Sequence, residues 1–225
     1  MRYLIILFMS LTLYCSEEDT NISTVNASSG LNHMSVKEKK KRFIKLLLPS
    51  VRHVHDRLMQ RYETVSNEIQ NKTNTQAIQK LKQEYKAQSD EDLLSRLKPH
   101  PISITLAQAA MESSWATSRI FLQAKNIFGM WSSDPKQQRI AAKEKRGGKH
   151  TVWLRKFDTI DDSVCAYYEM IAKGKVYNKF RQLRLQYSDP YKITSGLDKY
   201  SEMGSAYVTA INNVIKYNKF IQYDK

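Results

Sequence analysis

Glycine and proline are scarce in this chain, which holds 7 and 5 of them among its 225 residues. With 13 tyrosines present, this scarcity excludes a collagen-like, low-complexity or wholly disordered protein. Two cysteines, Cys15 and Cys165, are too few for a disulfide framework or a structural zinc site. The composition instead favours helix, and the length fits one compact domain with an extension better than two full domains.

Acidic residues are also in the minority, with 22 Asp and Glu against 36 Lys and Arg. The formal charge of +14 makes nucleic acid and anionic envelope polymers the partners to consider. The basic residues are scattered and no nucleic-acid-binding motif accompanies them, so we expect no nucleic-acid partner. Metal-ligand clusters and cofactor motifs are missing as well. We therefore expect that the protein needs no metal and no cofactor. We also expect it to be a monomer.

The N-terminal apolar run, residues 3–14, is too short to span a bilayer core of about 30 Å. It matches the core of an export signal peptide behind one positive charge. Cys15 follows it and resembles the lipidation site of bacterial lipoproteins, although bulky Tyr14 stands where a small residue is usual. Ordinary cleavage nearby and an uncleaved anchor are the alternatives. We expect residues 1–15 to be a lipoprotein-type signal peptide, with the protein held in the cell envelope or periplasm by a lipid on Cys15.

Three further stretches follow the signal. Residues 16–35 are rich in Ser, Asn and Thr without a period, which is typical of a flexible linker. Residues 36–70 carry apolar side chains at three- and four-residue steps and predict a long helix that Pro49 kinks or splits. A second helical segment covers roughly 75–97. We therefore expect 36–98 to be an N-terminal helical extension and 99–225 to be the functional domain.

A helix predicted over 102–116 is apolar almost all round, so it should be central to the fold. Glu112 lies near its C-terminal end. Burial raises the pKa of a carboxyl because the charged form loses hydration, and a helix C-terminus acts in the same direction. A carboxyl that stays protonated near neutral pH suits a general acid for a glycosidic oxygen. The alternative is an ion pair with Arg119 or Lys125, and the pattern alone does not choose.

Strand-like periodicity is confined to residues 138–157, which read QRIAAKEKR and HTVWLRKF on either side of Gly147-Gly148-Lys149. Two such runs around a glycine pair predict a β-hairpin. Asp158 and Thr159 then predict the start of a helix that Gly174 ends. A last helix is expected at about 204–221, with Tyr207 in its apolar stripe.

Four motifs in order resemble the glucosaminidase domain of glycoside hydrolase family 73. Residues 107–119 read AQAAMESSWATSR and 124–131 read AKNIFGMW, where the family typically has AQAALESGWGTSR followed by NNLFG. Residues 156–167 and 200–208 resemble two further family segments. The similarity is greatest to the Bax-type proteins of Gram-negative bacteria and covers about 36–223. Ser114 and Ala116 depart from the family pattern, which usually has Gly there, and we expect tighter packing near Glu112.

The resemblance implies a mainly α, lysozyme-like α+β fold, with a helical lobe, a small β-hairpin lobe and a cleft between them for a glycan strand. It implies that Glu112 is the general acid. The implied reaction is cleavage of the β-1,4 bond after N-acetylglucosamine in peptidoglycan. Muramidase-type and lytic-transglycosylase-type cleavage stay open, as does a non-catalytic peptidoglycan-binding relative whose site is closed by Ser114 and Ala116.

The family also implies a second carboxylate on the hairpin lobe. Glu144 lies 32 residues after Glu112 and is the only acidic residue between 135 and 157, but it is equally well explained as a solvated charge. Where no second acid acts, the N-acetyl oxygen of the sugar attacks instead. Tyr200 resembles a family tyrosine of the cleft that would orient this N-acetyl group, with core packing as its alternative.

Four more residues are candidates for contact with the sugar. They are Asn126, Phe128, Trp131 and Trp153. For Phe128 a place in the core is the simpler interpretation. Asn126, like the family's Asn, would brace the loop near Glu112.

Overall fold

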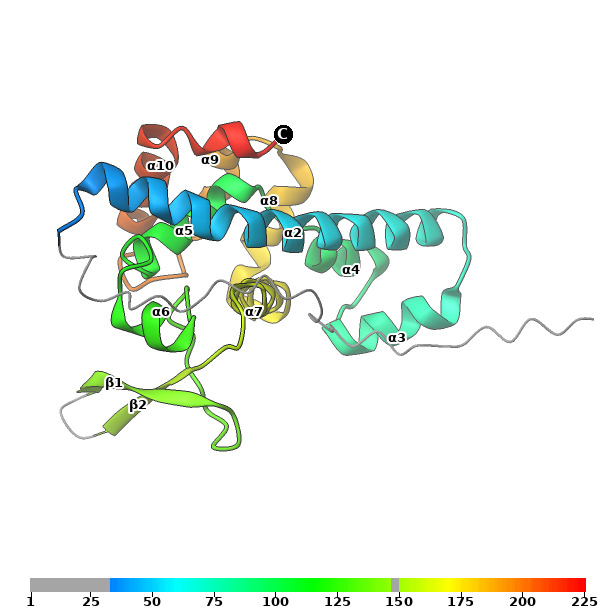
Figure 1. The fold of residues 1–225 in the computed structure, drawn as a ribbon. Coiled ribbons are helices and arrows are strands. Elements are labelled where there is room, and N and C mark those ends of the chain that lie inside the picture. The colour runs from blue at the N-terminus through cyan, green and yellow to red at the C-terminus, as the bar shows by residue number, and fades with distance from the viewer. Residues whose placement is uncertain (1–32, 147–149) are drawn as a thin grey trace, which may run out of the picture.

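The computed structural model describes residues 33–146 and 150–225, without the side chains of residues 144–146. Figure 1 shows a body of packed helices with one small two-stranded sheet to one side of it. The expected mainly α fold with a single hairpin is therefore confirmed. The signal peptide at 1–15, Cys15, most of the 16–35 linker and the Gly147-Gly148 turn lie outside the described residues. Within the described ranges, no helix is both long enough and apolar enough to cross a membrane.

The longest helix is α2 (Val36–Gln70), which runs across the helical body in Figure 1. Its start is fixed by Ser35, which accepts a hydrogen bond from the Glu38 amide while the Glu38 carboxylate bonds back to Ser35. The helix does not split at Pro49, contrary to that form of the prediction. Pro49 is on the exposed face, and burial of the residues on either side holds the helix together despite one missing hydrogen bond. The stripe that α2 contributes to the main core consists of Phe43, Leu47, Val51 and Val54.

The segment predicted as one helix over 75–97 is instead two helices, α3 (Thr75–Tyr85) and α4 (Asp90–Leu97). The break comes at Lys86, whose left-handed backbone with φ of 54° ends α3. Ser89 then starts α4, because its side chain accepts a hydrogen bond from the Asp92 amide at 3.0 Å. A cap inside the apolar pattern therefore sets a boundary that periodicity alone does not reveal.

The central helix is α5 (Ile102–Glu112), and its residues 102–110 are all buried. Helices α2, α10 (Ser205–Tyr217) and η3 (Phe220–Tyr223) pack around it. It ends at Glu112 rather than at 116, because residues 114–116 all have positive φ, of 51°, 60° and 58°. Two of these three positions are the ones where the family has glycine, which adopts this conformation freely. The departures at Ser114 and Ala116 therefore act first on the backbone.

The predicted hairpin is confirmed as β1 (Arg139–Arg146) and β2 (His150–Arg155), which pair antiparallel. Its register shifts in the middle, where residues 142–144 of β1 lie opposite Val152 alone. Such a bulge bends a strand and changes its local twist. Further along the chain, α7 (Ile160–Lys173) has the predicted Thr159 cap and lies against α2 and α4.

The remaining elements of the body are short. One of them, α6 (Arg119–Ala124), lies between α5 and the hairpin. The others lie between α7 and α10, and they are η1 (Lys175–Tyr177), α8 (Asn178–Gln186), α9 (Pro190–Ile193) and η2 (Thr194–Gly196). The helix predicted at 204–221 is α10 followed by η3. Gly204 makes the entry to α10 possible, since its φ of 56° and ψ of −126° lie in a region that side chains rarely allow.

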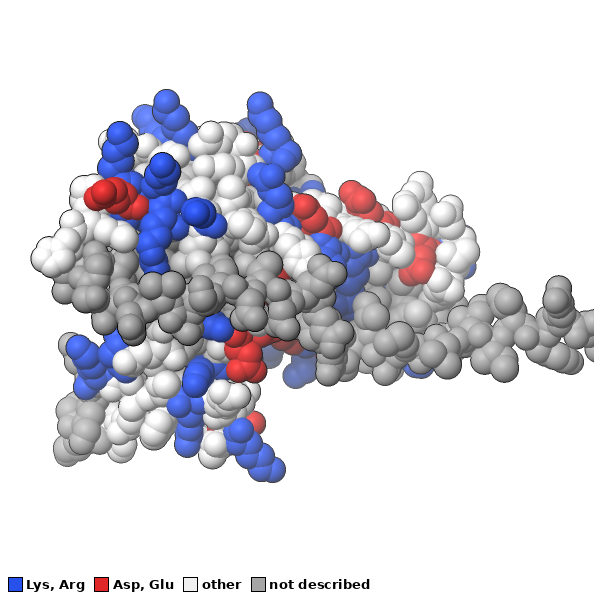
Figure 2. All heavy atoms as spheres, in the orientation of Figure 1, with Lys and Arg blue, Asp and Glu red and all other residues white. Residues whose placement is uncertain are grey.

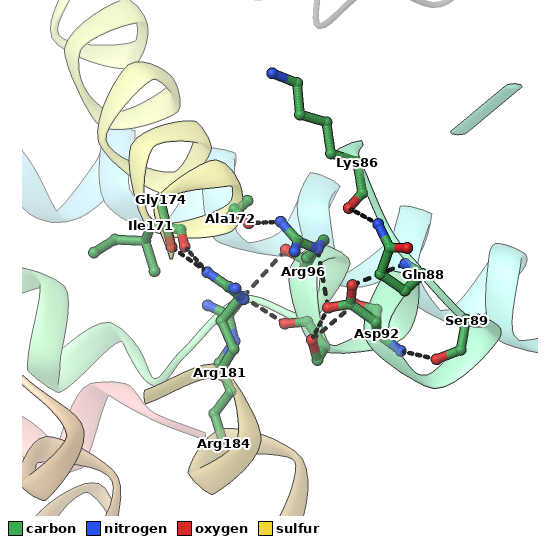
Figure 3. A network of polar contacts seen from close by, with 11 residues as sticks. Lys86, Gln88, Ser89, Asp92, Arg96, Ile171, Ala172, Gly174, Arg181 and Arg184 are labelled. Atoms are coloured by element: carbon green, nitrogen blue, oxygen red, sulfur yellow. Dashed lines mark hydrogen bonds and ion pairs between the residues drawn. The ribbon is translucent and has the colours of Figure 1, made fainter. Parts of the chain in front are cut away.

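Two buried arginines of α8 join helices that are far apart in the chain (Figure 3). Arg184 donates to the carbonyls of Ser95 and Arg96 at the end of α4, at 2.8 and 3.1 Å. Arg181 donates to two carbonyls at the end of α7. Both bring positive charge to the end of a helix where its dipole favours cations. Burial lowers the pKa of Arg184 to about 9, so this side chain is charged at neutral pH.

Candidate active site

Glu112 is the last residue of α5, and its side chain is partly buried. The Tyr207 hydroxyl of α10 donates to Glu112 Oε1 at 2.8 Å. Burial raises the pKa of Glu112, and the hydrogen bond from Tyr207 opposes part of that rise. The position at the C-terminal end of a helix acts in the same direction as burial. This carboxyl therefore holds a proton more tightly than one in water.

The alternative of an ion pair between Glu112 and Arg119 or Lys125 is wrong. Arg119 donates to the Ala141 carbonyl of β1 at 2.7 Å, and so ties the hairpin to the helical body. Lys125 donates to the carbonyl of Asp158. In the part of the chain that the structure describes, Glu112 has no ion-pair partner. Its carboxyl is therefore not held in the ionised form by a neighbouring cation.

Tyr200 lies beside this pair, in the turn that precedes α10. Its ring stacks on the Tyr207 ring with centroids 5.3 Å apart and an interplanar angle of 13°. Burial, and then the nearby charge of Glu112, raise the pKa of Tyr200 well above its usual range, so its hydroxyl stays protonated. Among the described residues this hydroxyl has no hydrogen-bond partner. It is a neutral donor close to the Tyr207–Glu112 pair.

Asn126 and Phe128 face the interior. The Asn126 amide donates to the carbonyls of Met130 and Arg155, both at 2.9 Å, and accepts from the Met130 amide at 2.8 Å. These bonds brace the loop after α6 against β2 and leave Asn126 1% exposed. Phe128 stacks on Tyr167 with centroids 4.0 Å apart and is also buried. Neither side chain is presented to solvent, where a sugar would meet it.

Trp131 and Trp153 are exposed, at 62% and 37%, but they lie on opposite faces of the hairpin. Trp131 forms an antiparallel bridge with Leu154, and directly opposed residues share a face. Trp153 precedes Leu154 in β2, so its side chain points to the other face, where the Arg139 guanidinium lies 4.4 Å from its ring centroid. The two tryptophans therefore do not form one platform for a sugar.

Glu144 lies in the bulged part of β1, and its side chain is outside the described part of the structure. Across residues 33–146 and 150–225, no three His, Cys, Asp or Glu side chains gather as metal ligands would. Figure 2 shows Lys and Arg spread over the helical body and the hairpin rather than gathered in one patch. The titratable chemistry of the described site is thus that of Glu112 and the tyrosines around it.

The sequence pattern places Tyr207 in the core stripe of the last helix, whereas the structure gives it a direct hydrogen bond to Glu112. Gln108 was likewise not a candidate, yet its side chain is fully buried and donates to the Tyr207 hydroxyl at 3.1 Å. Two signals pointed to them. Tyr207 stands in the closing family motif, and Gln108 lies on the Glu112 side of its helix.

Two solved structures are similar to this chain. The glycoside hydrolase domain of FlgJ from Salmonella typhimurium is 14% identical, with a TM-score of 0.50 over 81% of this chain and 90% of that chain. An N-acetylmuramoyl-L-alanine amidase from Staphylococcus aureus is 18% identical, with a TM-score of 0.51 over 84% of this chain and 44% of that chain. At these identities the likeness shows the fold. The class it defines is the lysozyme-like α+β fold.

The chain belongs to the glucosaminidase family, described as mannosyl-glycoprotein endo-β-N-acetylglucosaminidase, whose model matches residues 87–220. Protein bax from Escherichia coli (strain K12) is 30% identical over 94 residues, which are 42% of this chain and 32% of that protein. The match spans about a third of that relative's length. The resemblance to glycoside hydrolase family 73 and its Bax-type members is thus confirmed, and the chain is a member of a glycoside hydrolase family.

Proposed function

We propose that this chain is a peptidoglycan hydrolase that cleaves the β-1,4 bond after N-acetylglucosamine, with Glu112 as the general acid. The observation that carries the proposal is the partly buried Glu112 carboxyl, whose pKa is raised and which has no cation beside it among the described residues. A carboxyl that holds its proton near neutral pH can transfer it to the leaving glycosidic oxygen. Membership of the glucosaminidase family supports N-acetylglucosamine as the sugar whose bond is cleaved.

Peptidoglycan is the proposed substrate because of where the chain is expected to work. An export signal over 1–15 leads to the cell envelope, and a charge of +14 attracts anionic envelope polymers. A lipid on Cys15 would hold the enzyme, as a monomer, at the membrane surface. Metabolic labelling with radioactive palmitate tests this anchor. We expect label in the wild-type protein and none after Cys15→Ser.

Two chemistries fit the step that follows protonation. In the first, Glu144 is the second carboxylate, acting as base about 6.5–9.5 Å from the acid or as nucleophile at about 5 Å. In the second, the N-acetyl oxygen of the sugar attacks the anomeric carbon and no second acid is required. Tyr200 supports the second route, since its hydroxyl is a neutral donor near Glu112 and is able to orient the N-acetyl group.

Digestion of purified peptidoglycan sacculi tests the main proposal. The wild-type protein, Glu112→Gln and the control Glu63→Gln are compared, with fragments identified by mass spectrometry before and after borohydride reduction. Glu63 is an exposed residue of α2, so its substitution makes the same chemical change away from the site. We expect reducing N-acetylglucosamine ends from the wild type and the control. Loss of the general acid should lower the rate by about 10²–10⁴-fold.

Other outcomes of the digestion have definite meanings. Reducing N-acetylmuramic acid ends would move the cleaved bond, and anhydro ends would indicate transglycosylation. Undiminished cleavage by Glu112→Gln would remove this residue from the chemistry. Pelleting with sacculi and no released fragments would identify a binding module.

The second catalytic group is tested by Glu144→Gln and Tyr200→Phe in the same assay. If Glu144 is base or nucleophile, Glu144→Gln loses about as much rate as Glu112→Gln, and Tyr200→Phe loses less. If the N-acetyl oxygen attacks, the order reverses. A substrate analogue whose N-acetyl group lacks a nucleophilic oxygen would then also resist cleavage.

A further inference from the structure

A line of buried hydrogen bonds leads from Glu112 into the centre of the molecule. Behind the bond from Tyr207, the Gln108 amide donates to the Tyr207 hydroxyl at 3.1 Å. The Tyr167 hydroxyl donates to Gln108 Oε1, and it lies 2.9 Å from Nε2 of His100. The four side chains behind Glu112 are at most 2% exposed, and they are those of Tyr207, Gln108, Tyr167 and His100. Tyr207 belongs to α10, Gln108 to α5 and Tyr167 to α7, and His100 lies just before α5. The line therefore crosses the core from one helix to the next.

The line ends at Arg184, whose Nη1 lies 3.4 Å from Nδ1 of His100. A guanidinium can only donate, so Nδ1 of His100 must accept. Burial and the Arg184 charge lower the pKa of His100 well below its usual range, so the ring is neutral. A neutral imidazole carries one proton, which is therefore on Nε2. His100 thus donates from Nε2, which lies 2.9 Å from the Tyr167 hydroxyl and 3.0 Å from the Thr105 hydroxyl, and this nitrogen cannot accept.

The direction of every later bond follows from that of the first. Nε2 of His100 carries a proton and cannot accept from Tyr167, so the Tyr167 proton goes to Gln108 Oε1. That choice directs the Gln108 NH₂ group to the Tyr207 oxygen, and the Tyr207 proton is left for Glu112. The reverse direction would require a proton on Nδ1 of His100, aimed at the guanidinium. Two facing donors cannot bond, so Arg184 blocks the reversal.

Arg184 is itself held in place. Its Nη2 donates to the carbonyls of Ser95 and Arg96 at the end of α4, as Figure 3 shows. Its charge therefore stays at the far end of the line whatever happens at Glu112. Four hydrogen bonds separate His100 from the Glu112 carboxyl.

We propose that Arg184 and His100 fix the direction of this line, so that Tyr207 always donates to Oε1 of Glu112 and the proton that Glu112 transfers is carried by Oε2. The proton-transfer part rests on the proposed function. Tyr167, Gln108, His100 and Arg184 are positioning residues, since they act on Glu112 through Tyr207. The line supports the ionised carboxyl after transfer, and it leaves one defined oxygen to face the substrate.

The other groups near Glu112 do not replace this control. Besides Tyr207, the titratable groups of the described residues that interact with its charge are Tyr200 and Tyr177, both with raised pKa values. On α2, Arg42 donates instead to the Ala116 carbonyl at 3.1 Å. Beside η3, Asp224 accepts from the Ser103 amide at 2.7 Å, at the other end of α5.

The test is a carboxyl ¹³C NMR titration of Glu112 in the full chain, with the signal assigned by its loss in Glu112→Gln. No substrate is needed, so the result stands even if the chain does not cleave peptidoglycan. Gln108→Met and His100→Phe each break the line with little change of shape, since His100 already packs among aromatic rings. Thr105→Val is the matched control. It removes a buried hydroxyl that lies 3.0 Å from Nε2 of His100 and 2.8 Å from the Tyr168 hydroxyl but is not part of the path from Arg184 to Glu112.

Gln108→Met and His100→Phe should each raise the pKa of Glu112 by about half a unit or more. In both variants the Tyr207 hydroxyl is no longer forced to donate to the ionised carboxyl, which is therefore less stabilised. Tyr207→Phe sets the upper limit of this shift, and Thr105→Val should not shift it. The basic limb of the cleavage profile, where Glu112 loses its proton, should move to higher pH in the same variants. If His100→Phe and Gln108→Met leave the titration at its wild-type position while Tyr207→Phe moves it, the line is packing only. If one line variant does not fold, the other decides.

Discussion

At the scale of the residue, Glu112 is placed where its ionised form is poorly solvated. Its pKa is raised by burial above the value in the unfolded chain. The folded protein therefore binds this proton more tightly than the unfolded chain does. The stabilisation that results is complete below the unfolded pKa of about 4.3 and is lost as pH rises through the folded pKa. The burial that raises this pKa thus weakens the fold at neutral pH.

Glu112→Gln should therefore stabilise the protein at pH 8, by about 1 kcal/mol, and by much less at pH 4. The amide keeps an oxygen for the Tyr207 hydroxyl and carries no charge to desolvate. Thermal unfolding followed by circular dichroism at pH 4, 6 and 8 measures the difference. Glu63→Gln, on the exposed face of α2, should show no such trend. A Glu112→Gln protein that melts below the wild type at pH 8 would contradict this account.

At the scale of the element, the turn that follows Glu112 at the end of α5 has a strained backbone. Residues 114–116 are all left-handed, a conformation that costs an L-residue about 1–2 kcal/mol. The turn is nevertheless well bonded. The Trp115 amide reaches the Ala110 carbonyl at 2.8 Å, and the Ser113 hydroxyl accepts from the Ala116 amide, also at 2.8 Å. Packing and these bonds together hold a backbone that the side chains themselves disfavour.

Ser114→Gly should consequently stabilise the protein by about 0.5–1 kcal/mol, because glycine adopts positive φ without strain. Ser114 is exposed, so little packing is lost. Ser66→Gly, inside the C-terminal part of α2, is the matched control and should destabilise by about 0.5 kcal/mol through helix propensity. Urea unfolding gives both values. Equal destabilisation by the two substitutions would show that the turn is not strained.

The same turn shows what local sequence chemistry can and cannot predict. The hairpin and the start of α7 were predictable, because a Gly-Gly pair and the Thr159 cap act on neighbouring residues. The end of α5 was not, because Ser114 and Ala116 carry no local sign of positive φ. The helix break at Lys86 has the same origin.

The candidate site follows the same division. Glu112 was predictable from helix burial and a motif. Its partner Tyr207 is 95 residues away, and only the packing of α10 on α5 brings their side chains together. The same holds for the sugar-contact candidates, since pairing of Trp131 with Leu154 decides which face of the hairpin each tryptophan occupies.

At the scale of the whole molecule, α2 belongs to the main core, although it precedes the residues that match the family. Leu47 is fully buried there. Leu47→Ala should cost about 2–5 kcal/mol and lower the stability of the whole protein in one transition. Lys45→Ala, two residues earlier on the exposed side, should stay within about 0.5 kcal/mol. Unfolding of the 36–98 stretch in a separate, earlier transition would show that it is an independent unit.

The contacts of α2 with the turn after α5 bear on how this enzyme can be cut into working fragments. Arg42 donates to the Ala116 carbonyl, and the Phe43 ring meets Trp115 edge to face at 5.2 Å. At the other end of α5, Asp224 accepts from the Ser103 amide. Both supports lie outside residues 87–220, where the family match begins and ends. A recombinant fragment trimmed to those limits would bare the apolar surface that α2 covers, and we expect it to aggregate during expression.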